Sequence, residues 1–125
     1  MGGMKLDGAG AQKMKTLEEG FLTLTRVNAI IERAAVDAKA NKPIGTAAQQ
    51  IKRCVVPLQG QLKGQFGMIS DQLANYILVI TRGGGGDQSK IRVMREGLAQ
   101  IKQLMDFAVN KVKADHGVEI EIAPD

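Results

Sequence analysis

The sequence predicts an all-α protein, an elongated up-down-up bundle of three helices with a kinked middle helix. Three long stretches repeat apolar residues at alternating steps of three and four, the spacing of helices that bury a seam against one another. The chain also holds only three Phe, one Tyr and no Trp, whereas β-rich cores usually contain more aromatic side chains. Its 125 residues suffice for one domain with its own core.

The first helix is expected over about residues 11–40, after a flexible leader formed by residues 1–10. Asn28 interrupts its apolar seam, either as a buried residue that fixes register or because the helix is rotated to bring the neighbouring Val27 inward. Pro43 ends the helix, since proline disfavours the α region in the residue before it. The seam reads Met14, Leu17, Phe21, Leu24, Asn28, Ile31, Ala35 and Ala38.

The second helix is expected over residues 46–82, with Thr46 as its N-cap. Pro57 removes a backbone donor inside it, and each of the three glycines that follow weakens a helix by about 1 kcal/mol. The apolar seam nevertheless crosses this region, so we predict one kinked helix. The alternative is a break between Pro57 and Gly67, which gives four helices. The seam is Ile51, Val55, Leu58, Leu62, Phe66, Ile69, Leu73, Tyr76 and Ile80.

A glycine connection at residues 83–86 precedes the third helix, which we expect to begin at Asp87 or Ser89 and to end at Asp115 or His116. Gly117 is the expected residue after the helix end. Because both connections are short, successive helices should pack antiparallel within a domain of residues 11–117. The third seam is Ile91, Met94, Leu98, Ile101, Met105, Ala108 and Val112.

Residues 118–125 are expected to form an extended tail, and residues 118–122 alternate apolar and acidic side chains like a short strand. A lone strand is not stable by itself, and we expect no second strand in this chain to receive it. We therefore expect the apolar face of this strand to dock on the bundle or to pair with the same residues of another subunit. That face holds Val118, Ile120 and Ile122.

The middle region carries the candidate partner-binding surface. A stripe of glycines permits close approach of another helix, and the polar positions nearby are mostly glutamines rather than charged residues. Charge-depleted surface is typical of interface cores, so the stripe is predicted to bind itself or another protein. The alternative is that the chain's own helices cover it. The candidates are Gly60, Gly64, Gly67, Gln61 and Gln65.

Basic residues around the glycine connection form a candidate anion-binding site, because a helix N-terminus beside cations suits an anion. In an up-down-up bundle, Lys13 and Lys15 would come to the same end. The alternative is a solvated basic end. With a net charge of +4, this group supports a second hypothesis, a small basic nucleic-acid-binding helical protein. The candidates are Arg82, Lys90, Arg92 and Arg95.

No set of residues indicates catalysis, and one His with one Cys cannot supply a zinc site within one chain. We therefore predict no enzyme activity, no metal and no cofactor. No apolar run is long enough to span a membrane, and the lone Cys54 excludes an intrachain disulfide, which is compatible with the cytoplasm. The favoured function is a self-associating helical interaction module, such as an adaptor, scaffold or assembly subunit.

Overall fold

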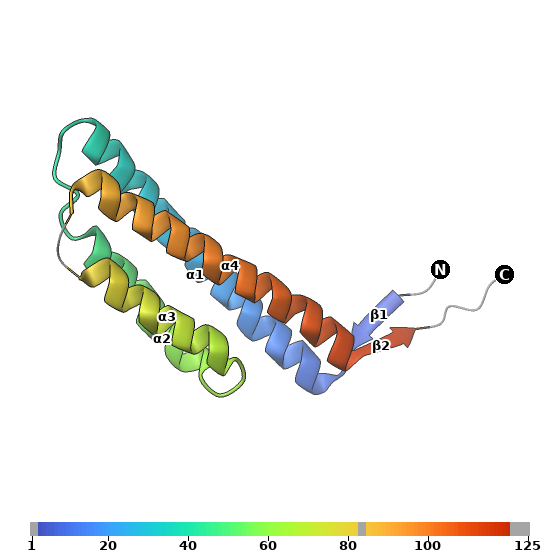
Figure 1. Cartoon of the computed structure of the whole chain (residues 1–125). Helices are drawn as coiled ribbons and strands as arrows, with labels where there is room; N and C mark the ends of the chain where they lie inside the picture. The colour runs from blue at the N-terminus through green and yellow to red at the C-terminus, as the bar shows by residue number, and fades with distance from the viewer. Residues whose placement is uncertain (1–2, 83–84, 121–125) are drawn as a thin grey trace.

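The computed structural model describes residues 3–82 and 85–120, which form four helices and a two-stranded ribbon (Figure 1). The first and last helices in the chain have 32 and 30 residues, and the second and third have 16 and 15. The all-α bundle is thus confirmed, with four helices instead of three. In chain order the elements are β1 (Gly3–Leu6), α1 (Gly8–Lys39), α2 (Ala47–Leu62), α3 (Gly67–Thr81), α4 (Asp87–His116) and β2 (Gly117–Ile120).

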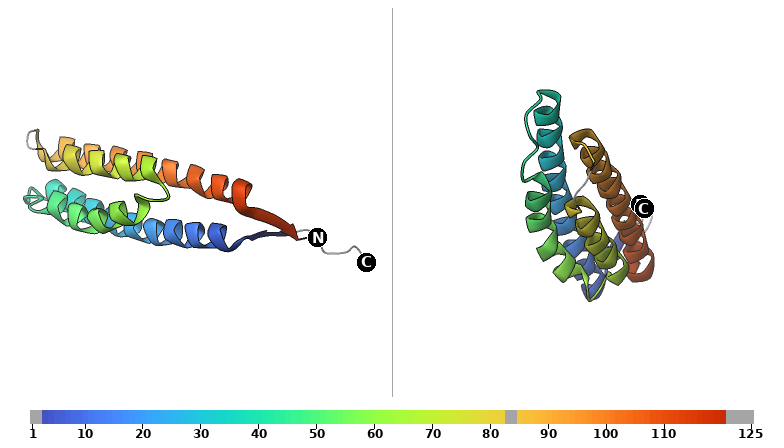
Figure 2. Two further views of the ribbon diagram at one scale, coloured as in Figure 1. Left: turned by 90° about the horizontal axis from the view of Figure 1, so that it is seen from below. Right: turned by 60° about the vertical axis from the view of Figure 1, so that its left-hand side comes forward.

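The long helices α1 and α4 run antiparallel side by side, and the α2–α3 hairpin packs on one half of this pair (Figures 1 and 2). In that half, α1 contacts α2 and α4, and α3 contacts α2 and α4. The other half of the pair extends beyond the hairpin towards the ribbon. The bundle therefore steps from four helices to two along its length.

The predicted kinked helix is wrong, and the alternative of a break is confirmed. The chain turns back over residues 63–66, whereas α2 runs through Pro57 to Leu62. Ser70 ties the two helices together, because its hydroxyl donates to the Gln59 carbonyl at 3.1 Å. Apolar spacing could not separate a kink from a hairpin, since both helices bury the same continuous seam against one core.

Local hydrogen bonding, and not only Pro43, ends α1. Asn41 adopts a left-handed conformation with φ of 59°. The Asn41 N–H donates to the Ala38 carbonyl at 3.1 Å, and the Lys42 N–H donates to the Asp37 carbonyl at 2.7 Å. This is the Schellman arrangement with Asn in the place that glycine usually holds.

The helix starts also differ in detail from the prediction. Thr46 stands at the N-cap of α2 as expected, although its hydroxyl caps no backbone N–H. Gly86 takes the N-cap position of α4, where Asp87 or Ser89 was expected. Gly117 ends α4 in an extended conformation with φ of −71°, so it is not a left-handed cap.

The buried core follows the predicted seams closely in α2, α3 and α4. Every seam residue there is buried except Phe66 and Ala108, which are half-buried. In α1 the rotated alternative holds: Asn28 is exposed, while Val27 and Ala34 are buried. Gly20 is buried as well, and it packs so closely against α4 that a Cβ there would lie 2.6 Å from Cε of Met105.

The ribbon corrects the expected leader and tail: the described part of the tail pairs with a strand of the same chain, where docking on the bundle or pairing with another subunit was expected. β1 pairs antiparallel with β2, from Gly3 opposite Ile120 to Leu6 opposite Gly117, and α1 begins at Gly8. The N-terminal strand has no alternating pattern, so the sequence did not reveal it. It pairs because antiparallel α1 and α4 bring both ends together. The expected face of Val118, Ile120 and Ile122 concerns side chains outside the described part.

Candidate functional site

An apolar groove of about 350 Å³ lies where the α2–α3 hairpin stops and the α1–α4 pair continues. Its volume falls within the range of about 300–1,000 Å³ usual for ligand pockets. The turn before α3 and the start of α3 form one wall, and the last turns of α4 form the other. The lining is Lys13, Gln65, Phe66, Gly67, Met68, Ile69, Leu104, Phe107, Ala108, Lys111, Val112, Asp115 and His116.

Two large apolar side chains of the groove are exposed. Met68 is 76% exposed and Phe107 is 63% exposed. Met68 stands in the first turn of α3, which has no side-chain cap, and Phe107 lies on α4 one position before the seam residue Ala108. Two contiguous apolar anchors are more informative than scattered ones, because isolated exposed apolar residues are normal on any surface.

The rim of the groove is polar and mostly basic. Lys111 and Asp115 form an ion pair along α4, with 3.6 Å between Nζ and Oδ2. Lys13 reaches the groove from α1. An apolar floor with a polar rim is the usual anatomy of a protein interface.

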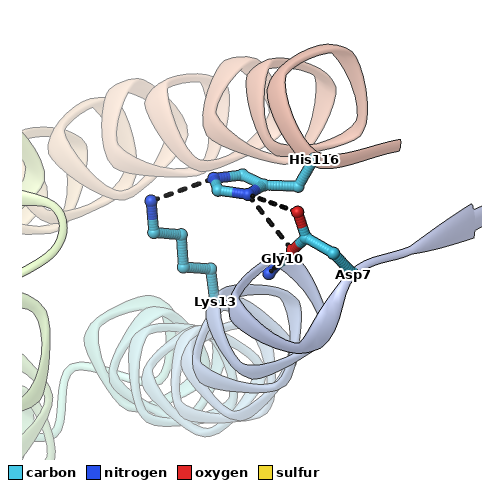
Figure 3. A network of polar contacts seen from close by, with 4 residues as sticks. All are labelled: Asp7, Gly10, Lys13 and His116. Carbon is cyan, nitrogen blue, oxygen red and sulfur yellow. Dashed lines mark hydrogen bonds and ion pairs between the residues drawn. The ribbon is translucent and has the colours of Figure 1, made fainter. Parts of the chain in front are cut away.

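A polar network joins the start of α1 to the end of α4 beside the groove (Figure 3). His116 Nδ1 lies 3.3 Å from each Asp7 carboxylate oxygen, and Lys13 Nζ lies 3.1 Å from His116 Nε2. An ammonium group can only donate a hydrogen bond, so Nε2 of His116 accepts from Lys13. Nδ1 therefore carries the hydrogen and donates to the Asp7 carboxylate. The backbone N–H of Asp7 also donates to the His116 carbonyl at 3.1 Å.

Asp7 holds this network in place. Its carboxylate caps α1 by accepting the Gly10 N–H at 2.7 Å. That bond, followed by His116 and Lys13, holds the pKa of Asp7 below its usual value. Gly10 is required here, because a Cβ would overlap the Cβ of His116. With both ring nitrogens of His116 occupied, the network is a structural connection between the chain ends.

The predicted partner-binding residues are all exposed, so the chain's own helices do not cover them. A Cβ added at Gly60, Gly64 or Gly67 would meet no atom within 4 Å. Gln65 and Gly67 line the groove, whereas Gln61 does not. Partner binding by these residues stays a prediction.

The predicted basic cluster stays at the connection between α3 and α4, with Arg82 at the C-cap of α3 and the other three residues in the first part of α4. Anion binding there stays a prediction. Arg92 and Arg95 border one shallow hollow together with Glu96, and neither Arg82 nor Lys90 lines it. Arg95 also donates to both carboxylate oxygens of Glu32 at 3.1 Å.

The expected position of Lys13 and Lys15 was wrong. Lys13 contacts His116 at the end of α4, far from the start of that helix. The break at residues 63–66 adds one more reversal, which sends the start of α1 to the opposite end of the bundle.

Sequence reasoning missed the two anchors of the groove. Phe107 lies outside the 3,4 seam of its helix. An aromatic residue off the seam of a long helix would have indicated an exposed apolar anchor. Met68 gave no such signal, because its exposure depends on where the hairpin turns.

No family model matches the chain, and neither a curated protein nor a solved structure matches it. Among the helices that the structure describes, none is long and apolar enough to cross a membrane. Within the same residues, no group of three metal-binding side chains comes together. The class defined by the fold is a helical bundle with an apolar groove at its step.

Proposed function

We propose that this chain is a non-enzymatic interaction module, an adaptor, scaffold or assembly subunit, that binds an amphipathic helix of a protein partner in the groove. The observation that carries the proposal is the position of the groove at the end of a helical layer. The proposal includes a cytoplasmic location, with which a single cysteine is compatible.

The lengths of the helices favour a helical occupant. At 1.5 Å per residue, α4 extends over about 45 Å and α2, the longer helix of the hairpin, over about 24 Å. The α1–α4 pair therefore continues for roughly 20 Å past the hairpin. A partner helix of about four turns, placed end to end with α3, would continue the missing layer.

The chemistry of the groove supports an apolar face on that helix. Phe107, Met68 and the half-buried Leu104 offer large side chains without charge. Helices recognised in grooves present apolar anchors at i, i+3, i+4 and i+7. Methionine adapts to anchors of different shape, because its thioether chain is flexible.

A peptide selection tests the proposal. A displayed library of amphipathic helices is selected against the natural chain, and the selected peptides are measured against Phe107→Lys. Leu22→Lys is the matched control, because Leu22 is also 63% exposed but lies outside the groove lining. Both variants add the same charge at an equally exposed site.

We expect the selected peptides to carry helical apolar spacing. They should lose binding at least about tenfold with Phe107→Lys, because a charge replaces an exposed apolar anchor that the bound peptide would cover. Leu22→Lys should bind as the natural chain does. Equal binding to both variants would contradict the proposal, and so would a selection that yields no helical peptide.

The second hypothesis, nucleic-acid binding, has less support. Its basic residues lie at two ends of the bundle, and Arg95 is paired with Glu32. Phosphate-tracking proteins instead gather their cations along one surface.

A further inference from the structure

The outward face of α3 has the composition of an interface, and it lies apart from most of the groove. The helix holds a single charged residue, Asp71, among fifteen. Leu78 is 63% exposed and Val79 is 40% exposed. A solvated helix face normally mixes acidic and basic residues, so this face is unusually apolar and uncharged for a helix face that contacts only water.

An exposed stripe on this face follows the spacing of a coiled-coil seam. Its steps of 3, 4, 3 and 4 place all members along one side of the helix. The opposite side is the one that packs into the core, so the stripe is a second face with the 3,4 spacing, and nothing in the described part of the chain covers it. Two of its members, Met68 and Leu78, are large, apolar and exposed. Its members are Met68, Asp71, Asn75, Leu78 and Arg82.

The two charges of the stripe stand at its opposite ends. Asp71 lies in the second turn of α3, and Arg82 is its C-cap residue. Among the residues that the structure describes, neither of them takes part in an ion pair. They are eleven residues apart, about three turns, so both face the same way.

We propose that a second copy of this chain binds the outward face of α3, with the two α3 helices antiparallel about a two-fold axis midway between Asn75 and Leu78. In this register Asp71 of each copy faces Arg82 of the other, and Leu78 of each faces Asn75 of the other. A parallel pair would instead oppose like charges, so the charges select the antiparallel arrangement.

The dimer is reversible and depends on concentration. The contact runs along α3 alone, which is about 22 Å long. A pair of helices this short buries less surface than the roughly 1,600 Å² typical of stable interfaces. The inference rests on the proposed interaction function for its context, but it uses another face of the bundle except for Met68, which lines the groove and stands at one end of the stripe. The groove and the dimer can therefore fail independently.

Sedimentation velocity over a range of concentrations tests the dimer, with circular dichroism to show that each variant is folded. Leu78→Lys should make the protein monomeric, whereas Leu22→Lys, at an equally exposed site on α1, should not. Phe107→Lys should leave the dimer unchanged, because it alters only the groove.

Charge reversal tests the register. Asp71→Arg alone and Arg82→Asp alone should each weaken the homodimer roughly tenfold, because each places like charges opposite one another. A mixture of these two variants should form a heterodimer, since every facing pair is then complementary. The double variant should recover the homodimer.

Three results would overturn the inference. The first is a natural chain that stays monomeric at millimolar concentration. The second is a mixture of the two charge variants that associates no better than either alone. The third is a dimer lost with Phe107→Lys and kept with Leu78→Lys, which would assign self-association to the groove.

Discussion

Gly97→Ala should destabilise the bundle even though alanine favours helices. Gly97 lies in α4 against the ring of Tyr76, and a Cβ there would stand 2.5 Å from ring atom Cε1. The ring cannot easily move, because Tyr76 is only 3% exposed and its hydroxyl donates to the Met94 carbonyl at 2.8 Å. The added methyl group must therefore displace a side chain that is held at both ends.

The magnitude follows from opposing terms. Alanine gains about 1 kcal/mol of helix propensity over glycine. Overpacking costs about 1–3 kcal/mol, and loss of the buried hydroxyl bond costs about 1 kcal/mol more. The net loss in the free energy of unfolding is about 1–3 kcal/mol, or roughly 4 °C in Tm for each kcal/mol. Urea unfolding followed by circular dichroism measures it.

Gly60→Ala is the matched control, because Gly60 is helical and exposed and a Cβ there would meet no atom within 4 Å. It should raise stability by up to about 1 kcal/mol. Tyr76→Phe should cost about 1 kcal/mol, and combining it with Gly97→Ala should cost less than the sum. A Gly97→Ala variant as stable as the natural chain would refute the close packing of α3 on α4.

Three further results are expected. Asp7→Asn should be less stable than the natural chain well above pH 3.8, and the difference in Tm should close as pH falls through the lowered pKa of Asp7, where the natural carboxylate is protonated too. Burial raises the pKa of Tyr76, the single tyrosine, so stability should be intact below about pH 10 and fall as pH rises, and tyrosinate absorbance should appear only with unfolding. Gly10→Ala should lower Tm by pushing His116 away from Asp7, and an unchanged Tm would mean that the chain ends are not joined in this way.

The core could be predicted because burial repeats with the helix period. Ile91, Met94 and Ile101 were identified from spacing alone, and all are buried. The reversal after Leu62 could not, since the same seam suits a kink and a hairpin. The expected position of Lys13 depended on this choice. A reversal of the chain inverts the direction of every later helix, so the basic start of α4 lies at the end of the bundle opposite to Lys13.

The groove and the ribbon could not be predicted from the sequence, for a related reason. The groove exists because α3 begins at Gly67, which exposes Met68 and leaves Phe107 uncovered. The strand Gly3–Leu6 forms because α4 ends beside the start of α1. Both depend on where helices end in space, whereas periodicity reports only which face of each helix is buried.

Methionine methyl NMR gives the most direct test of helix binding in the groove. Met68 lines the groove, Met94 and Met105 are buried in the core, and Met14 borders a separate hollow between α1 and α4. During titration with a selected helical peptide, the Met68 methyl signal should shift with peptide concentration, while those of Met14, Met94 and Met105 stay in place. A shift of Met14 with Met68 unmoved would place the peptide elsewhere and contradict the proposed function.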